Sequence, residues 1–264
     1  MRLRDLTARP VPGAPNLFRK VPEITVVFWI VKLLTTAMGE STSDFLVFQI
    51  NAYVAVVLGF LGLIVALILQ FAVRRYIAWV YWLTVVMVAV FGTMAADVLH
   101  VVLHVQYWQS TLLFAVCLAV VFTLWYRSEH TLSIHTIYPG RRELFYWATV
   151  MATFALGTAA GDLTAATLGL GYFPSLILFA VLFLIPAVGY KFFGWNEVFA
   201  FWFAYVITRP LGASFADWTG KPFLGGLGLG DGKVAIALTI LIAIFVAYLS
   251  VSKIDVPDRE PATT

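Results

Sequence analysis

The segment FWIVKLLTTAMGESTSD, residues 28–44, is the first of four copies of one pattern. In each copy an aromatic residue precedes a Trp, nine residues separate that Trp from a Gly, and four separate the Gly from an Asp. The copies are Phe28, Trp29, Gly39 and Asp44; Tyr81, Trp82, Gly92 and Asp97; Tyr146, Trp147, Gly157 and Asp162; and Phe201, Trp202, Gly212 and Asp217. Such self-similarity at intervals of about 53 to 65 residues indicates a tandem repeat.

Each copy begins one of a pair of long apolar segments. The segments lie at 24–44, 48–73, 77–104, 108–126, 144–168, 171–190, 197–217 and 233–252. About 20 residues are needed for a helix to cross a bilayer, and these runs lack the period-two alternation of strands. The chain is 61% hydrophobic and 12% charged, whereas soluble domains are about a quarter charged. The sequence therefore predicts an all-α polytopic membrane protein with about eight transmembrane helices, built from four parallel tandem two-helix repeats.

The basic residues predict the orientation of these helices. Thirteen of the 17 fall at one end of the helices: Arg2, Arg4, Arg9, Arg19, Lys20, Arg74, Arg75, Arg127, Arg141, Arg142, Lys191, Lys253 and Arg259. The positive-inside rule places that end in the cytoplasm. We expect a cytoplasmic segment 1–22, one transmembrane domain 23–252 with repeats at about 23–75, 76–127, 141–191 and 195–252, and a cytoplasmic tail 253–264.

This array of two-helix units, each with a characteristic Trp, resembles a family of bacterial membrane proteins defined by four copies of a repeat of unknown function. The resemblance rests on the four aromatic-Trp pairs with their Gly and Asp, and it covers about residues 22–252. It implies a protein of the bacterial inner membrane. It supplies no binding residues, so function has to be argued from the chain itself.

Parallel repeats place the four motif Asp residues at one depth. From Glu23 to Asp44 is about 32 Å of helix, so we expect the four Asp near the outer boundary, while Lys32 lies near the middle. A ring about a central axis and two paired lobes both satisfy the pattern. The motif Gly residues are expected to let helices approach closely, and the four Trp residues to set packing.

The first helix carries a polar stripe. Lys32, Thr36, Glu40 and Asp44 are four residues apart and share one helix face. Ionisable groups within a membrane span are costly and face the bundle interior. The functional interpretation is a cation path with Lys32 as counter-charge; the alternative is a structural pair between Lys32 and an acid.

Two more constellations could bind ions. Arg209 and Asp217 lie on the seventh helix, where Arg209 would be a fixed counter-ion or an anion site. The alternative is a packing kink at Pro210, with Arg209 paired to an acid on another helix. Asp97, His100 and His104 are spaced by three and four residues, so with Asp44 they form a candidate transition-metal set. The alternative is a group of polar residues at the interface. The glycine-rich run 220–233 is predicted to be a flexible outer link and lacks the features of a phosphate-binding loop.

These residues favour a secondary transporter or exporter of a small cation, including a divalent metal coupled to protons, with binding residues Glu40, Asp44, Asp97, Asp162, Asp217, Lys32, Arg209 and Thr36. The first alternative is an anion or organic-acid transporter that uses Lys32 and Arg209. The second is a membrane-embedded enzyme, cofactor carrier or scaffold. Because soluble catalytic motifs are absent, we expect no enzyme activity and no cofactor beyond a divalent metal ion. The expected partners are a small solute, the lipid bilayer and, as an open case, a second copy of the chain, but not nucleic acid, since the net charge is only +3.

Overall fold

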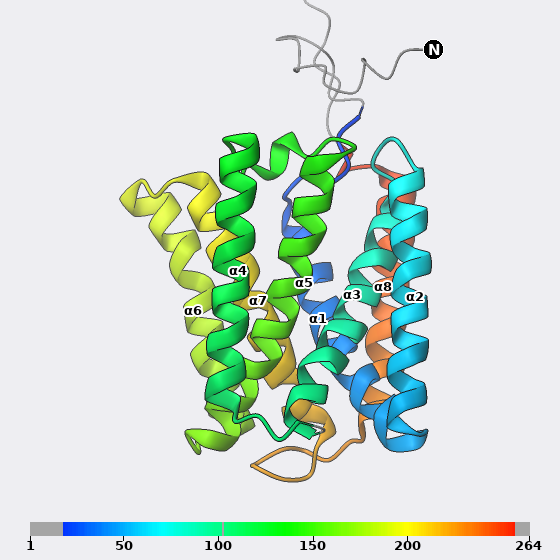
Figure 1. Cartoon of the computed structure of the whole chain (residues 1–264), viewed down its shortest axis with the longest axis vertical. Helices are drawn as coiled ribbons and strands as arrows, with labels where there is room; N and C mark the ends of the chain where they lie inside the picture. The colour runs from blue at the N-terminus through cyan, green and yellow to red at the C-terminus, as the bar shows by residue number, and fades with distance from the viewer. Residues whose placement is uncertain (1–17, 102, 257–264) are drawn as a thin grey trace, which may run out of the picture.

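The computed structural model describes residues 18–101 and 103–256 (Figure 1). The basic residues predicted to be cytoplasmic in 1–17, and Arg259 in the tail, lie outside the described residues. Within the described part the chain forms eight long helices and no strand: α1 Val26–Gln49, α2 Ala52–Ala72, α3 Ala78–Val101, α4 Tyr107–Glu129, α5 Arg141–Asp162, α6 Tyr172–Phe193, α7 Glu197–Gly220 and α8 Asp231–Ser252. A 3₁₀ turn, η1 (Ile134–Thr136), precedes α5, and a π-helical turn, η2 (Leu163–Thr167), extends it.

Seven of these helices are long and apolar enough to cross a membrane, as judged by length and composition. The eighth, α1, carries the polar stripe, which lowers its hydropathy. It lies among α2, α3, α7 and α8, so its polar side chains are shielded by other helices. The predicted all-α membrane protein with four tandem two-helix repeats is confirmed.

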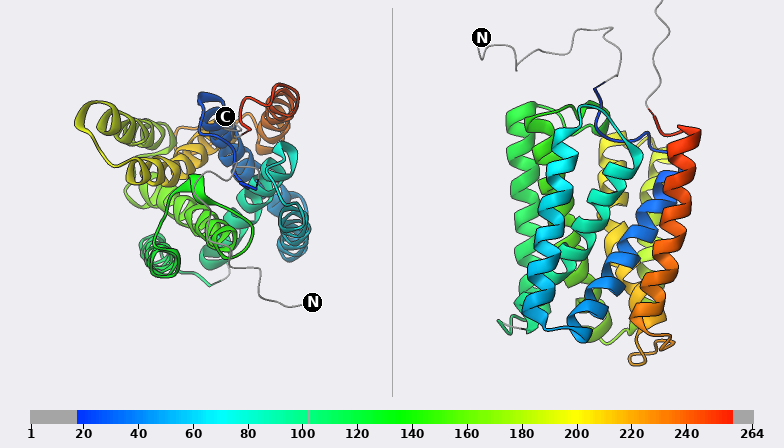
Figure 2. Two further views of the ribbon diagram at one scale, coloured as in Figure 1. Left: turned by 90° about the horizontal axis from the view of Figure 1, so that it is seen from above. Right: turned by 90° about the vertical axis from the view of Figure 1, so that its right-hand side faces the viewer.

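The odd-numbered helices form an inner ring. Helix α1 packs on α3, α3 on α5, α5 on α7, and α7 on α1. Each even helix lies outside, mainly against the odd helix of the following repeat: α2 on α3, α4 on α5, α6 on α7 and α8 on α1 (Figure 2). The repeats are therefore arranged as a ring, and the alternative of two paired lobes does not apply.

The motif glycines lie where neighbouring inner helices touch. A Cβ added at Gly39, Gly92, Gly157 or Gly212 would lie 2.4 Å from Ala89 Cβ, 2.8 Å from Phe154 Cβ, 2.2 Å from Arg209 Cγ and 2.0 Å from Thr36 Oγ1, respectively. The four residues contacted occupy one position of the repeat, eight residues after its first aromatic. One contact is thus used four times, and the contact of Gly212 with Thr36 joins the fourth repeat to the first.

The motif aromatics form a second closed ring, which we call the aromatic collar. The first aromatic of each repeat contacts the Trp of the next. The ring centroids are 5.7 Å apart for Phe28 and Trp82, 5.6 Å for Tyr81 and Trp147, 6.2 Å for Tyr146 and Trp202, and 5.7 Å for Phe201 and Trp29. Such pairs stabilise packing beyond the area that they bury. The order of contacts is that of the glycines, so the two rings reinforce one arrangement.

The described residues before α1 and after α8, 18–25 and 253–256, cover one end of the bundle, which we call the terminal end; it is at the top in Figure 1. The N–H of Lys20 donates to Ile137 O over 2.9 Å, and the N–H of Glu23 donates to Asp255 O over 2.9 Å. The buried Lys20 Nζ lies 3.0 Å from Glu143 Oε1. Burial raises the pKa of the neighbouring Asp255 carboxyl. These bonds close the terminal end over the inner ring.

Candidate functional site

The opposite end of the bundle, the far end, gathers carboxylates because the four inner helices all finish there. Each motif Asp lies in the closing turns of its helix, and Glu40 lies one turn earlier on α1. We call these residues the acidic cluster: Glu40, Asp44, Asp97, Asp162 and Asp217. Glu40, Asp44 and Asp217 are buried, and each offers a carboxylate oxygen within 4.8 Å of the others, close enough to share one metal ion.

Asp97 and Asp162 complete this cluster on its exposed side. Both are partly exposed, and both are electrostatic neighbours of Glu40 and Asp44. The structure therefore brings together the five acids that the repeat pattern singled out. Carboxylate oxygens suit hard cations such as Mg²⁺, Ca²⁺ and Mn²⁺.

Lys221 inserts into the acidic cluster. Its Nζ lies 2.8 Å from Asp44 Oδ2 and 2.7 Å from Asp217 Oδ1. Burial lowers the pKa of Lys221, but the carboxylates of Asp217 and Asp44 outweigh this effect and hold its pKa well above the usual value. An ammonium group tethered to the chain thus occupies the place of a cation.

The loop that carries Lys221 is held against α7. The N–H groups of Leu227, Gly228 and Leu229 donate to the carbonyls of Trp218, Lys221 and Thr219 over 2.6, 3.1 and 3.0 Å. The link predicted at 220–233 is thus tied to the end of α7 by hydrogen bonds that its glycine-rich composition does not reveal. The sequence analysis did not select Lys221; its spacing of four residues from Asp217 was the available signal.

Arg209 lies on the axis of the inner ring, next to the acidic cluster on the side of the terminal end. Its Nη2 donates to Glu40 Oε2 over 2.8 Å, to Thr158 Oγ1 over 2.7 Å and to Thr93 Oγ1. Glu40, Thr93 and Thr158 occupy the same position in three repeats. The fourth repeat has the small Ala213 there, which leaves room for the guanidinium. The Arg209–Glu40 pair is therefore a polar plug on the axis.

Thr36 was predicted to bind the ion, but its contacts give it a different role. Its hydroxyl donates to Leu33 O over 2.7 Å, and its carbonyl accepts from Arg209 Nη1 over 2.9 Å. The Thr36 side chain lies against Gly212. It supports Arg209 through its backbone and packs the ring, instead of offering a hydroxyl to an ion.

Lys32 lies deeper, between the plug and the aromatic collar. It is 1% exposed, and its Nζ has no hydrogen-bond partner in the part of the chain that the structure describes. The Nζ lies 4.1 Å from the centroid of the Phe154 ring and 4.2 Å from that of Tyr205. Glu40 is already paired with Arg209, so the predicted structural pair between Lys32 and an acid of its own stripe does not form. Contact with aromatic faces contributes about 2 kcal/mol when desolvated, which is less than the several kcal/mol that burial of an ammonium costs.

The two rings and the site are built from the same four repeats that a known family model describes. The model of the family described as Repeat of Unknown Function (DUF347) matches residues 27–76, 80–131, 145–194 and 200–255. The chain belongs to this family. No curated protein and no solved structure matches it.

The predicted transition-metal set is not assembled in this DUF347 protein. His100 uses both ring nitrogens locally: Nδ1 lies 3.0 Å from Val105 O and Nε2 lies 3.3 Å from Ser110 Oγ. His104 is exposed in the link between α3 and α4. Asp97 joins Asp44 in the acidic cluster, but His100, in the last turn of α3, is bonded to the link and to α4, and His104 lies in the link itself.

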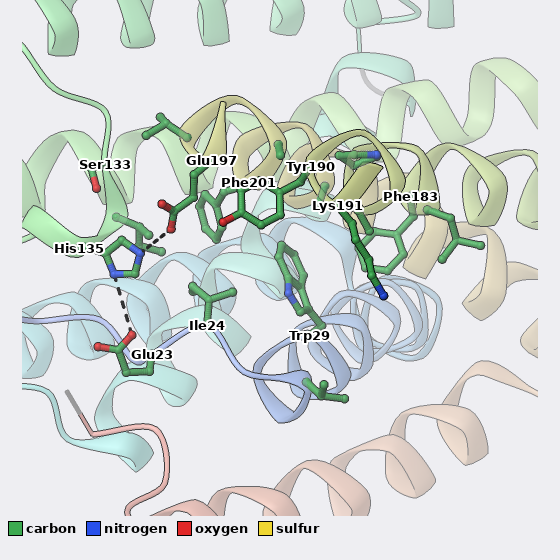
Figure 3. A pocket seen from close by; sticks show the side chains of 18 of the residues that line it. Glu23, Ile24, Trp29, Ser133, His135, Phe183, Tyr190, Lys191, Glu197 and Phe201 are labelled. Carbon is green, nitrogen blue, oxygen red and sulfur yellow. Dashed lines mark hydrogen bonds and ion pairs between the residues drawn. The ribbon is translucent and has the colours of Figure 1, made fainter. Parts of the chain in front are cut away.

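A cavity of about 760 Å³ lies elsewhere, on the side of the DUF347 bundle between α1, α6, α7 and η1 (Figure 3). At its polar end His135 Nε2 lies 3.0 Å from Glu197 Oε1, and His135 Nδ1 lies 3.9 Å from Glu23 Oε2. Its other walls include the exposed apolar side chains Val26 and Leu184. No member of the acidic cluster lines it. We take the acidic cluster as the functional site because it combines burial, charge and convergence of four repeats.

Proposed function

We propose that this protein is a secondary transporter or exporter of a small hard cation, a divalent metal ion above all, coupled to protons. The observation that carries the proposal is the ammonium of Lys221 between Asp44 and Asp217. Because the acidic cluster already binds one positively charged group, the ammonium of Lys221, it can bind a free metal cation in its place. The incoming cation would displace Lys221 and take up oxygens of Glu40, Asp44 and Asp217.

The charge of the site supports a cation. All five carboxylates of the acidic cluster are electrostatic neighbours of Lys221, and Glu40 also pairs with the plug residue Arg209. Converging carboxylates repel one another, and a bound cation or proton relieves that repulsion. Asp97 and Asp162, partly exposed, would attract the ion from water to the buried oxygens.

The orientation that we propose follows from the basic residues. Those at the terminal end include Arg74, Arg75, Arg141, Arg142 and Lys253. By the positive-inside rule the terminal end is cytoplasmic. We place the protein in the bacterial inner membrane with both termini in the cytoplasm and the acidic cluster facing outward.

Anion transport has weaker support in the contacts of the site. The Nη2 of Arg209 donates to Glu40, Thr93 and Thr158, and its Nη1 donates to Thr36. Among the described residues, this leaves the Lys32 ammonium and the unpaired Nε of Arg209 as the main donors for an anion, and both are buried. Among the described residues of the site, no nucleophile is paired with a base, so we propose transport and not catalysis. A cofactor carrier is the remaining alternative, and a coloured purified protein would favour it.

A thermal-shift screen of cations and anions on the purified protein tests the proposal. We expect stabilisation by one of Mn²⁺, Ca²⁺ or Mg²⁺ that is lost in both Asp44→Asn and Asp97→Asn. Glu197→Gln, an exposed carboxylate at the terminal end, is the matched control and should respond as the wild type does. Flux assays in vesicles then follow with the stabilising ion. Normal flux in both Asp variants would refute the proposal, and stabilisation by an anion that depends on Lys32 and Arg209 would favour the anion transporter.

A further inference from the structure

We propose that Lys32 is the proton carrier of this protein: a neutral amine while the acidic cluster holds either the Lys221 ammonium or a bound cation, and an ammonium in the step between, after the cation has left and before Lys221 returns. This inference rests on the proposed cation transport and names its coupling ion and the residue that binds it. The sequence analysis gave Lys32 as a counter-charge, a structural partner of an acid or an anion ligand.

The surroundings of Lys32 offer an ammonium no counter-charge. From α7, Tyr205 presents its ring and Arg209 adds a second positive charge nearby. From α5, Phe154 presents its ring. Glu40, two turns along α1, is engaged by Arg209.

The remaining neighbours add none either. The ionisable groups of α3 and α5 nearest this level are the tyrosines Tyr81 and Tyr146 of the aromatic collar. Helix α8, which packs on α1, has its acidic and basic side chains, Asp231 and Lys233, in its first turn at the far end. In the described structure, in which Lys221 occupies the acidic cluster, we therefore infer a neutral amine, because an uncompensated buried charge is the least favourable state available.

A proton suits this place better than an anion does. Lys32 lies against aromatic rings, and it lines neither the cavity of about 760 Å³ nor a smaller one between α1, α2, α3 and α8. An anion needs such a cavity, whereas a proton needs only the lone pair of the amine. Next to it, the Tyr205 hydroxyl has no hydrogen-bond partner in the described chain. The Tyr81 and Tyr146 hydroxyls, on the terminal-end side of Lys32, lie 2.5 Å apart.

Glu40 links the proton to the cation. It binds Arg209, and its carboxylate lies within 4.8 Å of those of Asp44 and Asp217. When a proton from water binds the Lys32 amine, the new ammonium repels Arg209 and attracts Glu40. Glu40 is then less available to the cation, so the cation leaves. Release of the proton to the opposite side restores the amine, and no other bond changes.

The first test uses protein reconstituted in vesicles, with Mn²⁺ as the probe. In the wild type, Mn²⁺ accumulation should follow an imposed pH difference, by about tenfold for each pH unit and each proton exchanged. Lys32→Met should still exchange Mn²⁺ across the membrane, but with no response to the pH difference. Lys191→Met removes an exposed lysine outside the site and should behave as the wild type does. Accumulation in Lys32→Met that still follows the pH difference would overturn the assignment.

A second test needs no transport and separates the two proposals. If the folded protein holds Lys32 neutral, unfolding takes up one proton, since a solvated lysine is protonated below about pH 10. Stability then rises with pH, and the unfolding constant falls about tenfold per pH unit relative to Lys32→Met between about pH 6 and 9. Equal slopes in both proteins would show a charged Lys32 and overturn the inference, even if Mn²⁺ is transported. Unequal slopes without Mn²⁺ transport would support a neutral Lys32 and count against the proposed function alone.

Discussion

Replacing Lys221 by Met removes the tethered ammonium from the acidic cluster and keeps a side chain of similar length. The substitution breaks two ion pairs, at 2.8 Å to Asp44 and at 2.7 Å to Asp217. At an effective dielectric constant of about 20, each is worth about 6 kcal/mol of Coulomb attraction. Desolvation of the three groups offsets most of this, and breaking a buried pair typically costs about 3 kcal/mol. We expect the cation-free variant to be destabilised by about that amount.

The same number sets the expected change in cation affinity. In the wild type a cation has to displace Lys221, so the strength of the Lys221 pairs is subtracted from its binding free energy. Without that competitor, about 3 kcal/mol corresponds to roughly 150-fold tighter binding, since 1.4 kcal/mol is tenfold. Reorganisation of the freed carboxylates reduces the gain, so we expect an increase between about 10- and 150-fold.

Isothermal titration of the purified protein with Mn²⁺ or Ca²⁺ measures this change. Lys221→Arg keeps the charge and should bind close to wild-type strength. Lys233→Met removes an exposed lysine at the same end and should change little. Unchanged or weaker cation binding in Lys221→Met, in a variant that remains folded, would refute the view that Lys221 stands in for the transported ion.

Two further variants test the inner ring. Glu40→Gln leaves the buried Arg209 without its carboxylate partner and should lower the free energy of unfolding by about 3–5 kcal/mol in detergent. A loss under about 1 kcal/mol, typical of an exposed ion pair, would show that the Arg209–Glu40 pair does not stabilise the inner ring as a buried pair. Gly212→Ala puts a Cβ 2.0 Å from a side-chain oxygen of α1 and should cost about 1–3 kcal/mol by overpacking. The control Gly161→Ala, where the added Cβ would meet only a methyl at 3.6 Å, should be neutral or slightly stabilising; equal stability of the two variants would argue against ring closure at Gly212.

The acidic cluster shows how far the sequence analysis reached. Parallel repeats with a fixed offset have to place corresponding residues at the same end of the bundle, so Asp44, Asp97, Asp162 and Asp217 could be selected from spacing alone. Glu40 was selected through its four-residue spacing in α1. The spacing of Asp97, His100 and His104 predicted one helix face, but α3 ends at Val101, so His104 lies in the link, and Val105 O and Ser110 Oγ engage His100.

The sequence by itself determined the number of repeats, their parallel direction, the membrane class and the end at which the acids gather, because each depends on periodicity and hydropathy along the chain. The tertiary structure alone decided three things. The repeats close into a ring through the glycine contacts. Glu40 pairs with Arg209, which leaves Lys32 without a partner among the described residues. Lys221 enters the acidic cluster. These are choices of partner between residues distant in the sequence, and they depend on which side chains fit and neutralise one another once the helices have packed.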